Sequence, residues 1–478
     1  MTEAAMQENR MGYMPEGSLL LRLSCPIMFS MCVQALYNVV DSLFVARLSE
    51  DALTAVSLAF PILNVFHALS IGAASGINAL LSKRLGEKNQ RAVNLAAGNG
   101  ILTWLLTGVI ALATALTCTR LFYETQAGQS VITELGVDYT TILLLFAVFP
   151  SGAITFERLL VSTGKSFYSM LAQAGGSLIN IVFDPIMIFG LFGCPAMGIK
   201  GAALATVMGQ ALQMGIAIYF NLTKNREINF SLKYFHPDVP TIKSIYAVGI
   251  PVSVMCSIGS FMVFGFNKIL LAYSSTAAAV LGVYFKLQSF IFMPIFGLNQ
   301  GMIPIIAYNY GARKPERMLR TLKLAVCTAV SVMFCGLLLF EFAAPQLLKM
   351  FAASDNMLAI GTIALRKIGI HFPLAGACIV IGGFFQALGD AWMSMINSIT
   401  RQLVFLLPSA YILSLLYGLN AVWWAFAIAE IASLALTVCF LKMAYARRIA
   451  GLKYNEECKM QSAKCKVKNE LEAISNKQ

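Results

Sequence analysis

The sequence predicts an all-α polytopic membrane protein in which twelve transmembrane helices form two six-helix bundles. Composition is the first observation behind this prediction: 58% of the 478 residues are hydrophobic and only 12% are charged. That is more apolar surface than a soluble core of this size can bury. The second observation is a series of long apolar segments, and the third is an internal repeat.

Twelve apolar segments are each long enough to cross a bilayer, which takes about 20 mostly apolar residues. Charged residues and clusters of Gly, Pro and Asn separate them. The segments are continuous, whereas the strands of a membrane β-barrel would alternate over about 10 residues. The predicted spans are 19–46, 53–82, 92–119, 131–157, 167–192, 198–221, 242–272, 276–308, 319–344, 358–387, 391–416 and 420–446.

The internal repeat relates the two halves of the chain. Pro26 and Pro251 are identical residues 225 positions apart (251 minus 26). The same offset joins Gly72 to Gly297, Gly76 to Gly301, Gly86 to Gly311, Gly164 to Gly389, and Met170 to Met395. Because the unit holds six spans, both copies enter the membrane in the same direction, related by an axis along the membrane normal. Two such bundles are expected to enclose a V-shaped central cleft that opens by rocking.

Positive charge predicts the orientation of the chain. Loops at 83–91, 158–165, 224–243 and 312–323 carry much of it and fall on one side, which is therefore expected to face the cytoplasm. The chain then divides into a cytoplasmic segment (1–17), a first bundle (18–222), a cytoplasmic linker (223–241), a second bundle (242–446) and a basic cytoplasmic tail (447–478). This arrangement is that of a multi-pass protein of the cell membrane. The tail is expected to contact anionic lipid headgroups, and no feature indicates nucleic-acid binding.

Asp41 is an ionisable residue deep in the first span. Such a placement costs at least ~2.5–3.5 kcal/mol, so an acid at this depth usually faces a cavity and binds a cationic group. Gln34, Tyr37 and Asn38 precede it by seven, four and three residues and share its helical face. These three side chains are candidates for substrate binding, or alternatively for hydrogen bonds between helices alone.

The fifth span carries a second acid. Asn180 and Asp184 are four residues apart and lie on one helical face. Pro185 removes an amide donor and leaves the Ile181 carbonyl without its usual helical partner. A carboxylate, an amide and a freed carbonyl make an oxygen-rich pocket suited to a proton or a monovalent cation.

The two halves differ at these acidic positions. At the repeat offset Asp41 corresponds to Phe266, and Asp184 to Ser409, or to Val404 if the local offset is 220. Only the first half therefore carries both acids. The alternative is that either acid only hydrogen-bonds a neighbouring helix, a less common role for an intramembrane carboxylate.

Cysteine and histidine give no indication of a metal centre or an enzyme. The 11 cysteines follow no disulfide pattern or zinc spacing. His67, His236 and His371 are far apart in the sequence, so they supply no catalytic constellation with a carboxylate. No enzymatic activity and no cofactor are expected.

Four blocks, in this order, resemble the multidrug and toxic compound extrusion family, in particular its branch common in Gram-positive bacteria. They are YNVVDSLFVARL behind Pro26, LINIVFDPIMIFGLFG with GIKGAALATV at 178–207, PIIAYNYGA at 304–312 and RQLVFLLP at 401–408. The resemblance extends from about residue 15 to 446. It implies two bundles in a V around a central cavity, and export of large cationic compounds against an inward proton or sodium gradient.

The resemblance also implies roles for individual residues. Asp41 stands at the family's first-helix acid, Asn180 and Asp184 match its fifth-helix pair, and Thr206 matches its sixth-helix hydroxyl. Small neighbours make Thr206 equally suited to close helix packing. These four are the expected cation-coupling residues, and the first three are the expected ligands if the ion is sodium. The second sodium site of one branch, with acids on the seventh and tenth helices, has no counterpart in this sequence.

The predicted function is secondary active multidrug export, in which lipophilic, mostly cationic compounds leave in exchange for protons or sodium by rocking-type alternating access. Gln34, Tyr37, Asn38, Asp41 and Asp184 are the candidate substrate-binding residues. The protein is expected to work as a monomer. The alternative is a lipid-linked-oligosaccharide flippase of the same wider superfamily, whose cleft would carry several cationic residues to hold a pyrophosphate.

Overall fold

The structure is a computed structural model that describes residues 9–46, 48–128, 130–351 and 354–452. Helices account for nearly all of these residues, which contain no strand. Ten helices are long and apolar enough to cross a membrane, and two bent helix pairs raise the number of spans to 12. The predicted all-α fold with twelve spans is confirmed.

The helices divide into two sets that follow the repeat. The first set comprises α1 (Glu16–Ala46), α2 (Glu50–Gly86), α3 (Gln90–Thr117), α4 (Thr119–Ala127), α5 (Val131–Leu145), α6 (Val148–Ser162), α7 (Ser166–Phe189) and α8 (Ile199–Lys224). The second comprises α9 (Val239–Leu271), α10 (Ser275–Gly311), α11 (Pro315–Lys349), α12 (Asp355–Gly369), α13 (Phe372–Leu388), α14 (Ala391–Ile399), α15 (Leu407–Tyr417), α16 (Leu419–Val422) and α17 (Ala425–Ala444). Short helices add η1 (Arg10–Gly12), η2 (Leu191–Gly193), η3 (Leu232–Tyr234), the π-helical η4 (Thr400–Leu406) and η5 (Tyr445–Ile449).

Two spans that the sequence predicts as continuous helices are bent. The fourth consists of α5 and α6, which meet at 42°, and the tenth of α12 and α13, which meet at 48°. Pro150 lies in the first turn of α6, and Pro373 lies in the first turn of α13. Because proline lacks the amide donor that continues a helix, each span breaks just before it.

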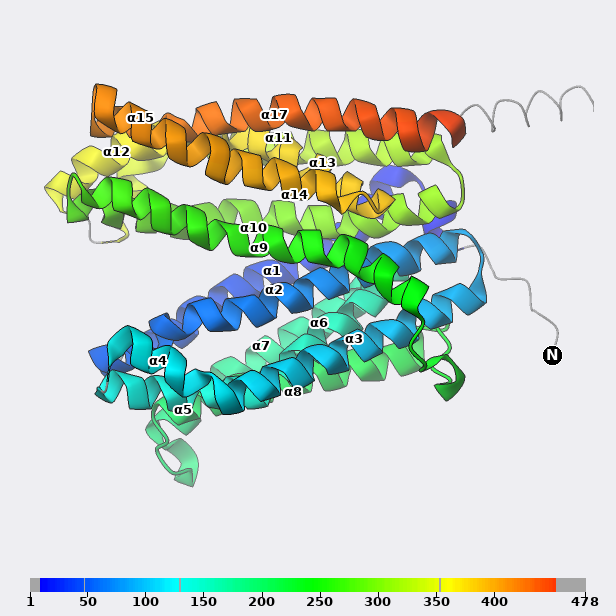
Figure 1. The fold of residues 1–478 in the computed structure, drawn as a ribbon, viewed down its shortest axis with the longest axis horizontal. Coiled ribbons are helices and arrows are strands. Elements are labelled where there is room, and N and C mark those ends of the chain that lie inside the picture. The colour runs from blue at the N-terminus through cyan, green and yellow to red at the C-terminus, as the bar shows by residue number, and fades with distance from the viewer. Residues whose placement is uncertain (1–8, 47, 129, 352–353, 453–478) are drawn as a thin grey trace, which may run out of the picture.

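The two bundles form separate layers that are close at one end and diverge toward the other (Figure 1). The contact between them runs along α1, α2, α9 and α10, with α2 against α9 and α1 against α10. The turn between α2 and α3, the linker between α8 and α9, and both η1 and η5 lie at the close end (Figure 1). This end carries the basic loops, so we call it the basic end.

The repeat extends to backbone conformation. Gly164 and Gly389, at the same offset, have φ angles of 84° and 87°. At the basic end Gly86 and Gly311 lie at equivalent contacts between the bundles. A Cβ atom on Gly86 would lie 2.0 Å from the Tyr308 carbonyl oxygen, and one on Gly311 would lie 2.1 Å from that of Lys83. Since Tyr308 and Lys83 are themselves repeat partners, a two-fold axis relates the two contacts.

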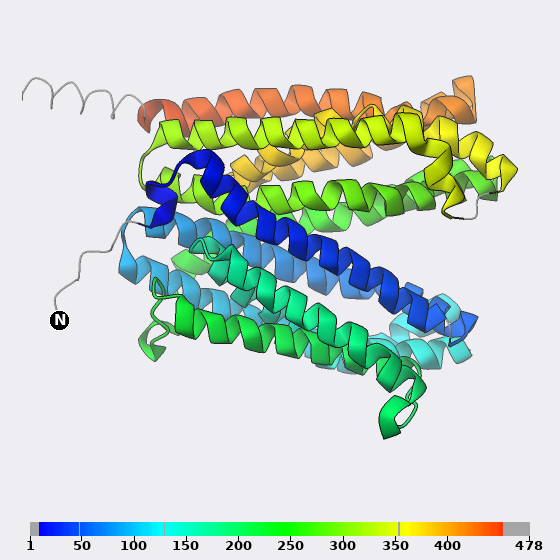
Figure 2. The same ribbon diagram turned by 180° about the vertical axis from the view of Figure 1, so that it is seen from behind.

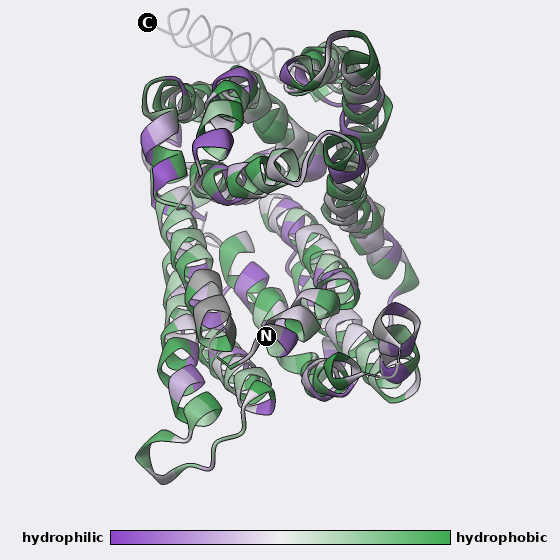
Figure 3. Cartoon of the chain, turned by 90° about the vertical axis from the view of Figure 1, so that its left-hand side faces the viewer, coloured by the Kyte–Doolittle hydropathy of each residue, from purple (hydrophilic) through white to green (hydrophobic). Residues whose placement is uncertain are grey.

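Apolar residues predominate along the helices of both bundles (Figure 3). Many large apolar side chains point outward, among them Phe264, Leu116 and Phe342, which are 63%, 72% and 74% exposed. Such surface is costly in water and favourable in lipid. The chain is therefore a multi-pass membrane protein.

Candidate functional site

The predicted site residues come from helices that pack on one another inside the first bundle. Helices α1 and α7 lie side by side, dark blue and blue-green in Figure 2, and α8 packs against α7. Asp41 lies in the last third of α1 and Asp184 in the last third of α7. Because both helices run away from the basic end, the two acids lie toward the end where the bundles diverge.

The carboxyl groups of Asp41 and Asp184 are close enough to share a hydrogen bond. Asp184 is fully buried, whereas Asp41 is half-buried and has one buried oxygen, Oδ1, without a hydrogen-bond partner. No lysine or arginine among the described residues pairs with either acid. A hydrogen bond between two carboxyl groups requires a proton on one of them.

Asn180, Thr206 and Tyr37 surround the acid pair. With its amide nitrogen toward Asp184, Asn180 donates to Asp184 Oδ2 at 3.0 Å and accepts from the Thr206 backbone N–H at 3.1 Å. The Thr206 hydroxyl donates to the Ala202 carbonyl at 3.0 Å. The Tyr37 side chain hydrogen-bonds Thr206 and lies near both acids. The structure thus brings together four of the candidate residues from α1 and α7, and Thr206 from α8.

Gln34 lies beside this cluster rather than in it. Its Oε1 accepts a hydrogen bond from Gln173 Nε2 at 2.9 Å, and it lines a polar cavity of about 50 Å³ together with Tyr37, Asn180 and Thr206. That volume holds a few water molecules at most. The helix around Asn38 is described, but the side chain of Asn38 lies outside the described residues, so its role stays a prediction.

Sequence reasoning missed several residues around the site. Tyr139 of α5 is 6% exposed and lies near both acids. Gln213 lines the small cavity and donates to Glu157 Oε1 at 2.8 Å, and Glu157 is itself buried. The sequence does carry a signal for Gln173, because it precedes Asn180 by seven residues on the same helical face. Tyr139 and Glu157 lie on other helices, and no sequence spacing relates them to the acids.

Two equivalent bundles of membrane-spanning helices, one of which holds an adjoining pair of acids, are typical of a membrane transporter. The family model for MatE matches residues 26–186 and 251–412, so the two matches begin 225 residues apart, at the repeat partners Pro26 and Pro251. Together they cover more than half of the sequence. The chain belongs to the MatE family.

Relatives and solved structures agree with this membership. The multidrug export protein MepA of Staphylococcus haemolyticus is 27% identical over 444 residues, which is 92% of this chain and 95% of the relative. MepA of Staphylococcus aureus is 25% identical over 419 residues, 87% of this chain and 91% of the relative. These names describe exporters and not enzymes.

Two of the similar solved structures are informative. One is described as an outward-facing conformation of a multidrug resistance MATE family transporter of the MOP superfamily, with a TM-score of 0.88, 26% identity, and coverage of 95% of this chain and 100% of that one. The other is a MOP superfamily transporter from Pyrococcus furiosus whose binding pocket is described as having reverse polarity, suggesting a different function. Its TM-score is 0.87 at 25% identity, with coverage of 94% of this chain and 100% of that one.

Proposed function

We propose that this protein exports lipophilic, mostly cationic compounds across the cell membrane in exchange for protons or sodium ions. The observation that carries the proposal is the pair of adjoining carboxyl groups of Asp41 and Asp184, which have no cationic partner among the described residues. Two acids at this depth are costly unless a cation is bound. An inward-moving ion and an outward-moving organic cation can each neutralise the acids in turn.

We propose different roles for the two acids, with Asp184 binding the coupling ion and Asp41 meeting the substrate. Asp184 is sealed inside the first bundle, where a proton or sodium ion can reach it but a bulky compound cannot. Asp41 is half-buried and is the acid that a substrate cation would meet. Because the groups adjoin, loading of Asp184 changes the charge that Asp41 offers to the substrate, and this couples the ion to the export.

We prefer the proton as the coupling ion. With the amide nitrogen of Asn180 assigned toward Asp184, its oxygen accepts from the Thr206 N–H and the amide acts as a donor to the acid. Sodium would need the amide oxygen turned toward the carboxylates, because metal cations bind oxygen ligands. If sodium is the ion, Asp41, Asn180 and Asp184 would be its ligands, after rotation of that amide.

The substrate class is proposed from the relatives and from the charge of the site. MepA proteins are named for multidrug export, and an acidic site favours cations. For the solved structure with reverse pocket polarity, that polarity is described as suggesting a different function, as expected if function depends on the site and not on the fold. The candidate site here carries acids, which gives the flippase alternative no support.

The proposed cycle is a rocking motion of the two bundles. The contacts at the basic end would part while the diverging ends approach, which exposes the site to each side in turn. The basic end is proposed to face the cytoplasm, with both termini on that side and the basic tail against anionic lipid. The tail from residue 453 lies outside the described residues. A single chain contains both bundles, so it is proposed to work as a monomer.

The test is export of an ethidium-like dye by the purified protein in sealed vesicles, with proton and sodium gradients imposed one at a time. We expect the proton gradient to drive dye movement, and a matched anionic dye to compete poorly. Absence of dye movement under either gradient, with protein correctly inserted, would refute ion-coupled export. Equal competition by the anionic dye would refute the cationic preference.

A further inference from the structure

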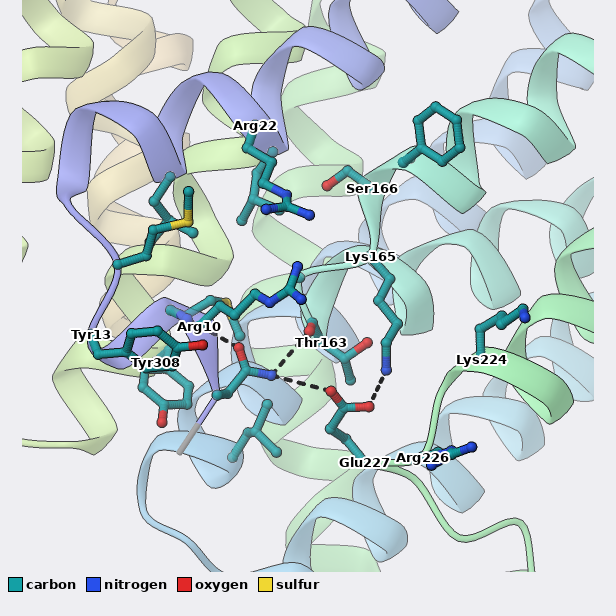
Figure 4. A pocket seen from close by; sticks show the side chains of 18 of the residues that line it. Arg10, Tyr13, Arg22, Thr163, Lys165, Ser166, Lys224, Arg226, Glu227 and Tyr308 are labelled. Atoms are coloured by element: carbon teal, nitrogen blue, oxygen red, sulfur yellow. Dashed lines mark hydrogen bonds and ion pairs between the residues drawn. The ribbon is translucent and has the colours of Figure 1, made fainter. Parts of the chain in front are cut away.

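A second, larger cavity lies at the basic end, away from the acid pair. Its volume is about 720 Å³. The walls are the N-terminal segment around η1, the first turns of α1 and α7, and the linker after α8 (Figure 4). This volume falls within the range of about 300–1,000 Å³ typical of small-molecule sites.

The lining of this cavity is strongly cationic. Six lysine and arginine side chains line it, against a single acid, Glu227: Arg10, Arg22, Lys88, Lys165, Lys224 and Arg226. Lys165 pairs with Glu227, which also accepts a hydrogen bond from Asn9 at 3.4 Å. The other five cations have no ion-pair partner among the described residues. These five side chains are exposed, and the described residues of the walls carry no second acid to neutralise them.

One buried hydroxyl without a hydrogen-bond partner lines the same space. Ser166 is 1% exposed, its hydroxyl has no hydrogen-bond partner, and it points into the cavity (Figure 4). It is also the first residue of α7, a helix of 24 residues that begins without a side-chain cap. The uncapped N–H groups of a helix start carry partial positive charge and bind anions.

Charge on a cytoplasmic loop has a simpler explanation, since positive residues orient membrane proteins. That explanation requires charge at this end but does not require it to converge on one cavity. Nor does it account for a buried serine hydroxyl left without a partner, which costs free energy unless a ligand or water satisfies it. In addition, burial lowers the pKa of the Lys165 ammonium, and an anion in the cavity would oppose this.

We propose that this cavity binds an anion that carries a phosphate group, either a free phosphate compound or the headgroup of an acidic phospholipid. Guanidinium groups and helix starts are the usual partners of phosphate in proteins. The aromatic side chains of Tyr13 and Phe167 on the wall suit an organic portion attached to it.

Binding here would also act on the contact between the bundles. The N-terminal segment that walls the cavity is held by the second bundle, through Asn309 Nδ2 to the Met11 carbonyl at 3.1 Å and Lys314 Nζ to the Gly12 carbonyl at 2.9 Å. Arg317 adds a bond to the Met14 carbonyl at 2.5 Å. An anion that bridges this segment to α7 is therefore expected to stabilise the closed basic end.

The experiment uses the purified full chain in nanodiscs of phosphatidylcholine, at constant ionic strength. Pyrophosphate and inorganic phosphate serve as free probes, and nanodiscs containing phosphatidylglycerol serve as the lipid probe. Binding is measured by calorimetry and by the thermal unfolding midpoint, and retained lipid by native mass spectrometry. Binding of pyrophosphate in neutral nanodiscs indicates a free phosphate compound, whereas retention of phosphatidylglycerol alone indicates a headgroup.

Two double variants distinguish specific binding of the anion in this cavity from general electrostatic attraction of anions to the basic end. Arg10→Gln with Arg226→Gln removes two charges that line the cavity, and the control, Lys233→Gln with Lys243→Gln, removes two charges of the same end that do not line it. All four side chains are exposed. We expect the first variant to bind roughly tenfold more weakly and the control to bind as the unmodified protein does. Ser166→Ala, which changes no charge, is expected to weaken binding by a smaller factor. The proposal fails if neither probe binds, or if the control variant loses as much affinity as the cavity variant.

Discussion

The two bundles place different chemistry at equivalent positions of the repeat. In the first bundle, Asp41 adjoins Asp184 in a polar cluster. In the second, the partner of Asp41 is Phe266, which is fully buried and packs against Phe426 and Trp423, with ring centroids 5.1 and 6.3 Å away. The same helical scaffold therefore supports an acid pair in one half and an aromatic core in the other.

The buried acids of the two halves differ in a second way. Glu430 of the second bundle is 3% exposed and has a cationic partner, since Arg401 Nη1 lies 3.3 Å from its carboxylate. Asp41 and Asp184 have no such partner among the described residues. An acid with its own counterion is a structural element, whereas an acid pair without one needs a mobile cation.

The strongest test of this contrast is Asp41→Asn. We expect it to abolish gradient-driven dye export while the protein still inserts and folds, because the exchangeable charge is lost and no partner is stranded. Glu341→Gln is the matched control, since Glu341 lies on a half-exposed surface pair with Arg366 and should leave export unchanged. Normal export by a correctly inserted Asp41→Asn protein would show that the acid pair is not the coupling site.

Glu430→Gln should act on stability instead. Removal of one partner strands the Arg401 guanidinium, and the expected loss is about 3 kcal/mol of unfolding free energy, while Asp41→Asn should cost little. Chemical or thermal unfolding of the purified proteins measures both. Arg401→Met combined with Glu430→Leu removes both charges and should recover most of the stability. If Glu430→Gln stops export without loss of stability, the second half also has a functional acid.

The two-fold contacts at the basic end predict equal effects in both halves. Gly86→Ala and Gly311→Ala each push a methyl group against a backbone carbonyl of the other bundle, at an expected cost of about 2 kcal/mol to the closed contact. Spin-label distances across the basic end should lengthen similarly in both variants. Gly282→Ala, which meets nothing within 4 Å, is the control. A marked difference between the two glycine variants would contradict the symmetry.

The smallest expected effect belongs to Phe266→Leu. It replaces one apolar side chain by another in the aromatic core of the second bundle, and should lower the unfolding free energy by about 1 kcal/mol. Export per folded molecule should persist, in contrast to Asp41→Asn at the equivalent position. Thermal unfolding and dye export from the same preparation check both expectations. Loss of export at unchanged stability would mean that this core takes part in transport.

Much of the fold follows from local properties of the sequence. Span length, loop charge and the 225-residue offset of Pro26 and Pro251 predict twelve helices in two equivalent bundles. Helical spacing also places Tyr37 with Asp41, and Asn180 with Asp184, on single faces. These features could be predicted because they depend on contiguous sequence alone. A span is recognised from the hydropathy of about 20 successive residues, and a helical face from the 3.6-residue period of the α-helix.

Other features depended on how distant helices pack. The approach of Asp184 to Asp41 and the position of Tyr139 beside them depend on how α1, α5 and α7 are arranged within the first bundle. The pairing of Arg401 with Glu430 likewise depends on packing between separate helices. The cavity that Ser166 lines is also formed by segments far apart in the chain. Spacing along one helix determines which side chains share a face, but it carries no information about which other helix covers that face. Tertiary packing therefore decided which buried acids have a cationic partner among the described residues and which do not.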